Sequence, residues 1–441
     1  MLEKIFKLSQ HQTSVKTEIT AGLTIFFTMA YILVVNPFIL SKTGMDFNAV
    51  MVATALTAVI GTLIMSLFAK LPVAVAPGMG LNAFFAYTIV MGMGYSWQFA
   101  LTAVFLEGIL FIILSLLNVR EAIINSIPAD MKRAISVGIG LFIALIGLVN
   151  AGIIETGMMH IGNNKLDGVI VKLGNMKSAS AIIVFAGLFV SAVLMFKKVN
   201  AALFIGIIAA TLTGIPLGLT HLPEISKFIS WPPSIAPVFF KLEFSKIFSW
   251  DMLIILFTLL TVNLFDTVGT LIGCCSAGNL LDKEGKIPNV KKALLADAIA
   301  TTSAALLGTS VATAYVESAS GIASGGKTGL TSFTVAIMFL LALFFAPLFA
   351  SIPAVATSPA LIIVGILMIR EIKQIDFNDM TNALPAFLTI VMMPFTYSIA
   401  EGIVFGMISY VILKLLSGRA KEISIAMYVL AVLFVISILV K

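Results

Sequence analysis

The chain has 441 residues, of which 60% are hydrophobic and only 11% are charged. A soluble domain carries about 25% charged residues, so this composition excludes a soluble globular protein and predicts a helical protein that crosses a membrane many times. The net charge of +6 is typical of membrane proteins with basic inner loops, and no basic patch with interleaved aromatic residues predicts nucleic-acid binding.

Apolar runs long enough to cross about 30 Å of hydrocarbon recur along the whole chain. In chain order they are 20–40, 49–69, 97–118, 133–152, 180–196, 200–217, 251–274, 292–308, 328–350, 355–369, 382–397, 401–417 and 424–440. Two further segments, 71–92 and 309–326, are apolar but broken by Gly or Pro. With each counted as one crossing, 1–217 and 251–417 hold seven crossings each, and an odd number makes the repeat inverted. The last run is either an additional span or an interfacial helix.

The charged loops predict an orientation. If the N-terminal segment lies in the cytoplasm, most other basic residues fall on the inner side as well. These residues are Lys70, Arg120, Lys132, Arg133, Lys197, Lys198, Lys283, Lys286, Lys291, Lys292, Arg370, Lys373, Arg419 and Lys421. The outer loops near 93–96 and 351–354 carry no Lys or Arg, and two longer outer segments are mixed in sign. We therefore expect a multi-pass protein of the cell membrane with a cytoplasmic N-terminus and no cleavable signal peptide.

The two broken segments predict the position of a ligand site. They read "LPVAVAPGMGLNAFFAYTIV" (71–90) and "GTSVATAYVESASGIASGGKTGLTS" (308–332), each a short β-prone stretch followed by the Gly- or Ser-rich start of a half-helix. Non-helical backbone at membrane depth is tolerated only when it is buried in protein or lines a wet cavity. Broken segments in corresponding places of two halves point to a transporter site. We expect the two extended stretches to pair and the half-helix N-termini to offer N–H groups to a small ligand.

Two acids inside the spans are the main candidates for the site, because an ionisable group there is costly and functional by default. Glu317 lies where the second extended stretch meets its half-helix, and its alternative role is a plain N-cap. Asp266, in "TVNLFDTVGTLIG", lies in the middle of a crossing that should pack against the broken pair. Its alternative role is that of a buried, hydrogen-bonded aspartate.

Four further residues complete the predicted substrate-binding set. Asn82 opens the first half-helix and offers both a donor and an acceptor, although it can also stabilise the helix. Tyr315 lies two residues before Glu317, on the same side of the extended stretch, where it can stack on a flat ligand or pack in the core. Gly80 and Ser318 lie at the starts of the two half-helices.

The remaining polar residues of the spans have weaker assignments. Lys327 is expected to have a structural role, by neutralising an acid or reaching towards the cytoplasm, and Asp297 to be paired structurally near Lys291 and Lys292. Glu107 has no obvious partner, so its role stays open. The two adjacent cysteines and three scattered histidines predict no disulfide framework, no metal site and no catalytic triad.

Two acids near one site suggest proton coupling, with no other cofactor. Burial can raise the pKa of a carboxyl group by about 3–5 units, which lets it load a proton outside and release it inside. One proton moving through about 100 mV yields about 2.3 kcal/mol, which supports roughly a fifty-fold solute gradient. Na⁺ in place of H⁺ stays open.

Several strings along the whole chain resemble the AzgA-like purine permeases of the nucleobase–cation symporter superfamily, which include guanine/hypoxanthine permeases. They are "FFTMAYILVVNP" (26–37), "APGMGLNAFFAY" (76–87), "LFDTVGT" (264–270), "YVESASG" (315–321), "SPALIIVG" (358–365) and "PAFLTIVMMPFTYSIAEGI" (385–403). The resemblance implies fourteen transmembrane segments in a seven-plus-seven inverted repeat, and proton-coupled import of a purine base, often by a homodimer. It places the family's two acids at Asp266 and Glu317, its asparagine at Asn82 and its stacking aromatic residue at Tyr315.

The same resemblance implies a division into a core and a gate domain. Residues 15–118 and 251–350 would form the core, and 119–217 and 351–417 the gate. Residues 218–250 would be an external loop and 418–441 a C-terminal segment. A uracil- or xanthine-type base, or an anion carried on the same fold, are alternative substrates, although an anion would be repelled by the two acids.

A third reading, that of a membrane ATPase, depends on "GIASGGKT" (321–328), which fits the P-loop pattern G-x-x-x-x-G-K-[ST]. The helix that follows, "TGLTSFTVAIMFLLALFF", is a membrane span, so a triphosphate would have to lie within the bilayer. We therefore expect no ATP site. The glycines are better explained as the end of the half-helix and its joint to the next span.

Overall fold

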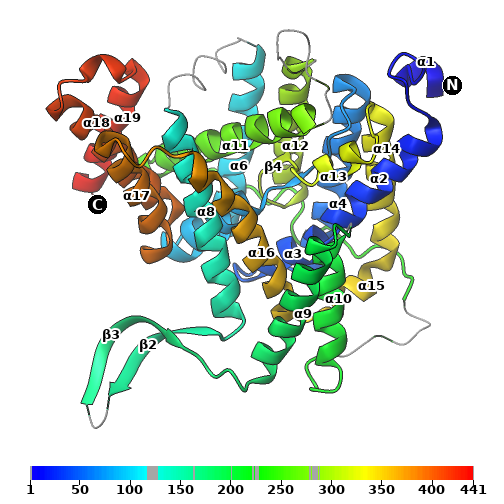
Figure 1. Ribbon diagram of the computed structural model, residues 1–441, viewed down its shortest axis with the longest axis horizontal. Helices are drawn as coiled ribbons and strands as arrows, with labels where there is room; N and C mark the ends of the chain where they lie inside the picture. The colour runs from blue at the N-terminus through cyan, green and yellow to red at the C-terminus, as the bar shows by residue number, and fades with distance from the viewer. Residues whose placement is uncertain are drawn as a thin grey trace.

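The computed structural model describes residues 2–116, 128–161, 164–199, 201–220, 223, 228–277, 280, 287 and 289–440. Arg120, Lys283 and Lys286, which belong to the predicted inner loops, lie outside the described residues. Helices predominate in the described part of the chain (Figure 1).

The elements of the first half are α1 Leu2–Phe6, α2 Val15–Met29, α3 Ile32–Ser41, α4 Phe47–Ile64, η1 Met65–Ala69, β1 Val75–Pro77, α5 Met79–Ala83, η2 Phe84–Gly92, α6 Trp97–Leu116, α8 Ala129–Asn150, β2 Ile154–Ile161, β3 Asn164–Leu173, α9 Ala179–Phe196 and α10 Ala202–Gly214. Those of the second half are α11 Trp250–Ala277, α12 Val290–Leu307, β4 Ala312–Ala314, α13 Ser318–Ala323, α14 Gly329–Ala342, η4 Leu343–Phe345, α15 Ala346–Ala350, η5 Ala354–Thr357, α16 Ser358–Ile369, η6 Arg370–Gln374, α17 Met380–Phe395, α18 Ile399–Leu416, η7 Ala420–Glu422 and α19 Ile425–Val440.

Eight helical segments among the described residues are long and apolar enough to cross a membrane. They are Val15–Ser41, Phe47–Ala69, Trp97–Leu116, Ala129–Asn150, Ala179–Phe196, Trp250–Val268, Gly329–Ala350 and Ala354–Gln374. Three shorter apolar helices are Met79–Gly92, Ala202–Gly214 and Met380–Phe395. The predicted class, a helical polytopic membrane protein, is confirmed.

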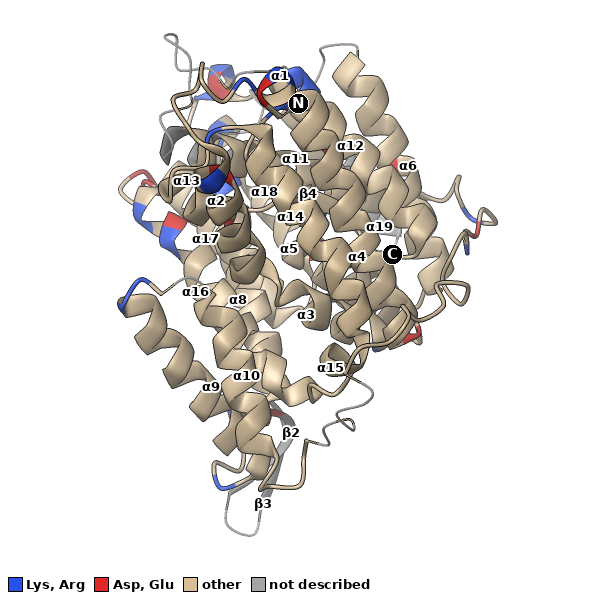
Figure 2. Ribbon diagram, turned by 90° about the vertical axis from the view of Figure 1, so that its right-hand side faces the viewer, with Lys and Arg blue, Asp and Glu red and all other residues tan. Residues whose placement is uncertain are grey.

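The surface of the helices suits a lipid environment. Large apolar side chains project outwards, as on α9, where Phe189 is 63% and Phe196 88% exposed. Charged residues gather at loops and helix ends, while α4 and α14 are almost free of them along their length (Figure 2). Such a surface would be unfavourable in water and is favourable against hydrocarbon.

Both broken segments have the predicted form of a short strand followed by a helix. Strands β1 and β4 pair antiparallel, with Val75 opposite Ala314, so the expected pairing of the two extended stretches is confirmed. Two threonines from neighbouring helices bind the strands' remaining backbone groups: Val75 N donates to Thr62 Oγ1 at 3.0 Å, and Thr301 Oγ1 donates to Ala312 O at 2.9 Å. The non-helical backbone is thus satisfied by protein, as membrane depth requires.

Close glycine contacts fix the packing of α8 against α16. A Cβ atom at Gly365 would lie 2.5 Å from Gly140 O, and one at Gly140 would lie 2.6 Å from Met368 Cβ. Small residues let two membrane helices approach closely, and van der Waals packing then holds them together. These two helices therefore form a closely packed pair beside the broken segments.

Three features differ from the prediction or extend it. The predicted span 20–40 is interrupted, because α2 ends at Met29 and α3 begins at Ile32, with Tyr31 between them. The predicted outer loop 153–179 contains the β2–β3 hairpin, which projects from the helices (Figure 1). The last apolar run forms α19, whose 16 residues are only about 24 Å long, so both proposed placements stay open.

A charged cluster joins the start of α17 to the end of α18. Thr381 donates its N–H and hydroxyl to Asp379, and Arg419 Nη1 donates to Asp379 Oδ2 at 2.6 Å. The Thr381 hydrogen bonds, followed by the Arg419 charge, lower the pKa of Asp379 to about 2. Lys414, only 2% exposed, binds Glu422 at 2.6 Å in the same cluster.

Candidate functional site

Glu317 lies at the start of α13, where β4 has just ended, and its side chain is only partly buried. Tyr31, in the interruption between α2 and α3, donates its hydroxyl to Glu317 Oε1 at 2.8 Å. Tyr31 is 1% exposed. Its contact joins the interruption between α2 and α3 to the start of α13, and the two residues are 286 positions apart in the sequence.

Asp266 lies on α11 beside β4, also partly buried. Thr313 Oγ1, on β4, lies 3.2 Å from Asp266 Oδ2. Asp266 contacts Thr313 on β4, and Glu317 follows the end of β4 by three residues, so both predicted acids lie beside the same strand. Two neighbouring, partly accessible carboxylates can accept N–H groups from one small ligand.

The buried side of Asp266 continues into a row of polar side chains. Thr267 Oγ1 lies 3.0 Å from Thr313 Oγ1, 2.9 Å from Asp297 Oδ1 and 3.2 Å from Asn263 Oδ1. Thr267, Asp297 and Asn263 are each 0% exposed. Asp297 therefore contacts Thr267 behind Asp266, whereas the sequence had suggested structural pairing near Lys291 and Lys292.

Glu107 belongs to the same buried region. Asn263 Nδ2 donates to Glu107 Oε1 at 2.9 Å, and Glu107 is 0% exposed on α6. The sequence offered no partner for Glu107, because its partner lies 156 residues away on another helix.

Asn82 and Gly80 lie at the first half-helix, as predicted. Asn82 is fully buried and its Oδ1 accepts a hydrogen bond from Ser310, while no described group binds its Nδ2. A Cβ atom at Gly80 would lie 2.8 Å from Ile139 Cγ2 on α8. The absence of a side chain at Gly80 thus allows the half-helix to approach α8.

Tyr315 and Ser318 both bind the first broken segment in this structure. Tyr315, 4% exposed, donates its hydroxyl to Pro77 O, and its N–H donates to Ala74 O at 2.9 Å. Ser318 Oγ accepts from Ala74 N at 3.0 Å. Both side chains stabilise the backbone that positions Glu317. A direct contact of Tyr315 or Ser318 with a ligand stays a prediction.

The second half-helix does not offer the free N–H groups that we expected. The N–H groups of Ser318, Ala319 and Ser320 donate to the carbonyls of Tyr315, Val316 and Glu317. The turn that precedes α13 satisfies them, because each N–H group bonds the carbonyl three residues before it. Recognition at this end must therefore depend on side chains.

The P-loop-like string forms the predicted joint between α13 and α14. Gly325 has φ +103°, a left-handed conformation that favours glycine, and Thr328 is the N-cap of α14. The N-terminus of α14 holds a carboxylate of the chain itself. Glu18 Oε1 accepts from Lys327 N, and Glu18 Oε2 accepts from the N–H and hydroxyl groups of Thr328 and Thr331, at 2.6–3.2 Å. Glu18 is 0% exposed, so no phosphate can take its place without displacing it.

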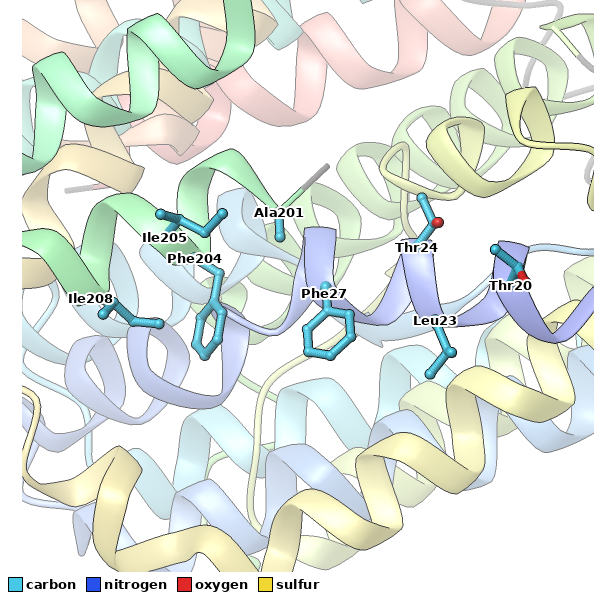
Figure 3. Close-up of a pocket in the computed structure, with 8 residues that line it drawn as sticks. All are labelled: Thr20, Leu23, Thr24, Phe27, Ala201, Phe204, Ile205 and Ile208. Atoms are coloured by element: carbon cyan, nitrogen blue, oxygen red, sulfur yellow. The ribbon is translucent and has the colours of Figure 1, made fainter. Parts of the chain in front are cut away.

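An apolar pocket of ≈ 430 Å³ lies elsewhere, between α2 and α10 (Figure 3). It is lined by Thr20, Leu23, Thr24, Phe27, Ala201, Phe204, Ile205 and Ile208. Two threonine hydroxyls are its only side-chain polar groups, so it cannot satisfy the polar edges of a hydrogen-bonding ligand. We do not place the candidate site there.

Two broken crossings whose strands pair across the two halves, with carboxylates at their junction, define a membrane transporter of the broken-helix class. The chain belongs to the Permease family (Xan_ur_permease), whose profile matches residues 16–405. This confirms the family resemblance seen in the motifs.

Named relatives agree with this assignment, and a solved structure shares the fold. The chain is 44% identical over 448 residues to guanine/hypoxanthine permease PbuO of Bacillus subtilis (strain 168), covering 98% of this chain and 99% of that protein. It is 42% identical over 438 residues to adenine permease AdeP of Escherichia coli (strain K12), covering 99% and 96%. The transmembrane domain of the cyanobacterial bicarbonate transporter BicA has the same fold, with a TM-score of 0.63 at 15% identity over 89% of this chain and 97% of that one.

The sequence missed Tyr31, Glu18 and the threonines of the polar row. A tyrosine in an apolar run is usually read as packing, and Glu18 lies in a charged terminal segment that looks solvated. Threonine is common in membrane helices and carries no separate signal. The one available hint for Tyr31 was its place in "FFTMAYILVVNP", a string already assigned to the family.

Proposed function

We propose that the protein is a secondary active transporter, not an enzyme, which imports purine nucleobases by proton symport. The observation that carries the proposal is the position of Asp266 and Glu317 beside β4, one of the two paired strands. A purine base is flat and neutral, and its ring and exocyclic N–H groups are donors that carboxylates accept. Asn82 can donate a hydrogen bond to an acceptor of the base. Tyr315 can stack on the face of the base if the strand region rearranges.

The names of the relatives support a purine over other substrates. PbuO is called a guanine/hypoxanthine permease and AdeP an adenine permease, at similar identities to this chain. We therefore propose hypoxanthine, guanine and adenine as candidate substrates, with uracil or xanthine as the nearest alternative. BicA supports the fold alone, and two carboxylates at the site disfavour an anion.

The proposed architecture has fourteen crossings in two inverted repeats, with the core and gate boundaries given above and a cytoplasmic N-terminus. The corresponding places of β1–α5 and β4–α13, and the basic loops, support it. The closely packed pair α8–α16 would belong to the gate, against which the half-helix at Gly80 packs. We also propose a homodimer, which cross-linking in native membranes tests.

Competition uptake in a permease-deficient strain tests the function. Labelled hypoxanthine, guanine, adenine, xanthine and uracil are supplied with and without a protonophore. We expect accumulation of at least one purine, abolished by the protonophore. No accumulation of any base contradicts the proposal, and accumulation that persists after the proton gradient collapses contradicts proton symport.

A variant at the site gives a sharper test. Glu317→Gln should abolish accumulation while the protein still reaches the membrane. The substitution exchanges one carboxylate oxygen, which accepts an N–H group of the ligand, for an NH₂ group, which can only donate. The matched control is Glu371→Gln in η6, away from the paired strands, which should leave uptake unchanged. Wild-type uptake by Glu317→Gln would remove Glu317 from the site.

A further inference from the structure

A row of four side chains leads from the candidate site into the buried core. Asp266 Oδ2 lies 3.2 Å from Thr313 Oγ1, which lies 3.0 Å from Thr267 Oγ1, which lies 2.9 Å from Asp297 Oδ1. Thr267 and Asp297 are 0% exposed and Thr313 is 2% exposed. The row therefore joins an accessible carboxyl group to a fully buried one through two hydroxyl groups.

If all three contacts are hydrogen bonds, the row holds one proton more than its two hydroxyl groups supply. Its three contacts need three hydrogen atoms, and the two hydroxyl groups of Thr313 and Thr267 supply two. If Asp266 and Asp297 were both ionised, each hydroxyl would donate to its own carboxylate. The two threonine oxygens would then face each other at 3.0 Å with lone pairs only. A protonated carboxyl group would supply the third hydrogen atom.

The side branch at Asn263 does not change this count. Asn263 Oδ1, 3.2 Å from Thr267 Oγ1, can only accept, so this contact raises the number of hydrogen atoms needed. Its Nδ2 donates to Glu107, the other acid that faces this region, on α6. An amide cannot pass a proton on without changing its chemistry, so Glu107 lies outside the row.

We propose, on the basis of the proton symport proposed above, that Asp297 and Asp266 share one coupling proton through Thr267 and Thr313. In one state Asp297 carries the proton and donates to Thr267, Thr267 donates to Thr313, and Thr313 donates to the Asp266 carboxylate. In the other state the Asp297 proton has moved to Thr267, the Thr267 proton to Thr313 and the Thr313 proton to Asp266. Both hydroxyl groups are restored, and one proton has moved from Asp297 to Asp266.

This arrangement lets one site hold the base and the proton together. An N–H group of the base binds an ionised Asp266 more strongly than a protonated one, because charge-assisted hydrogen bonds are the stronger ones. Binding therefore drives the proton to Asp297, which keeps the core neutral during transport. When the base leaves, the proton returns to Asp266, where it can reach water.

The test uses purified full-length protein in proteoliposomes with a labelled purine that the wild type transports. Exchange of internal for external base needs no net proton movement, whereas accumulation under an imposed proton gradient does. We expect Thr267→Val and Asp297→Asn to keep exchange within about threefold of wild type, and their accumulation ratio to fall from roughly fifty-fold to about one. Thr267→Ser, which restores the hydroxyl group, should accumulate like wild type.

Thr301→Val is the matched control. Thr301 lies one turn beyond Asp297 on α12, is also 0% exposed and donates to a strand carbonyl outside the row. It should keep both exchange and accumulation. Each variant is first shown to be folded by its elution profile and its unfolding temperature. Accumulation by Thr267→Val at the wild-type ratio overturns the proposal, and so does loss of exchange together with accumulation in folded Thr267→Val.

An infrared measurement separates this proposal from the proposed function. At pH 7 the wild type should show the C=O band of a protonated carboxyl group, and the band should be lost or shifted in both Asp266→Asn and Asp297→Asn. Absence of the band overturns the shared proton even if purine transport is found. Presence of the band with no base transported by the wild type supports the shared proton and overturns the proposed function.

Discussion

Glu18 is expected to hold the joint between α13 and α14, and its loss should destabilise the protein. In Glu18→Ala, three backbone N–H groups, those of Lys327, Thr328 and Thr331, lose their acceptor in a buried place. An unsatisfied buried donor costs about 1–3 kcal/mol, so the low end gives about 3 kcal/mol for the three. In Glu18→Gln the amide oxygen can keep the contacts of Oε2, and only the Lys327 contact is lost, at about 1 kcal/mol.

The assay measures the half-life of the folded protein in detergent at a fixed temperature, and the folded fraction is monitored by size-exclusion chromatography. A half-life is used because large proteins usually unfold irreversibly. About 3 kcal/mol corresponds to roughly a hundred-fold change, so the order of half-lives should be wild type, Glu18→Gln, then Glu18→Ala. Glu3→Ala is the control, since among the described residues the Glu3 carboxylate accepts from Ser9 N at an exposed position. A Glu18→Ala protein that survives as long as wild type would refute the reasoning.

Three further predictions concern the site and the loops. Tyr31→Phe removes the hydroxyl that orients Glu317, so we expect the KM for the purine to change several-fold in uptake assays while the amount of folded protein does not. Gly80→Ala should lower transport strongly in the same assay, because its Cβ would lie 2.8 Å from Ile139 Cγ2, and Ile139→Ala should restore part of it. Asp379 has a pKa lowered to about 2, so its contribution to stability is complete above about pH 4 and is lost only as the pH falls towards 2. Unfolding temperatures of wild type and Asp379→Asn should therefore differ by a constant amount between pH 5 and 8.

The sequence predicted the broken segments and their pairing because both follow from local signals. Pro77 disrupts a helix, the glycines disfavour one, and short stretches such as "VAVA" favour extended backbone. Unpaired backbone within a membrane needs a partner, and the other broken segment is the nearest candidate. The acids at 266 and 317 stood out for a similar reason, since charge within an apolar span is costly.

The partners of these residues could not be predicted, because they are set by packing between distant helices. Tyr31 reaches Glu317 only because α2 is interrupted, and no Gly or Pro marks that interruption. Thr267 belongs to the polar row because it lies on the face of α11 that packs against α12 and β4. The rotation of α11 decides which face that is, and the hydropathy of the sequence does not encode this rotation. The N–H groups of Ser318, Ala319 and Ser320 are bonded within the turn before α13, which the general rule for helix ends does not predict.

The pairing of β1 with β4 also constrains how the protein is made. Val75 is synthesised 239 residues before its partner Ala314, since 314 minus 75 is 239. At about 5–20 residues per second, the first strand waits roughly 12–48 s inside or beside the membrane with its hydrogen bonds open. During that interval a helper protein, water or a transient helical conformation has to satisfy the segment. The first half by itself cannot reach its final fold, so the two halves should be stable only when they are produced together.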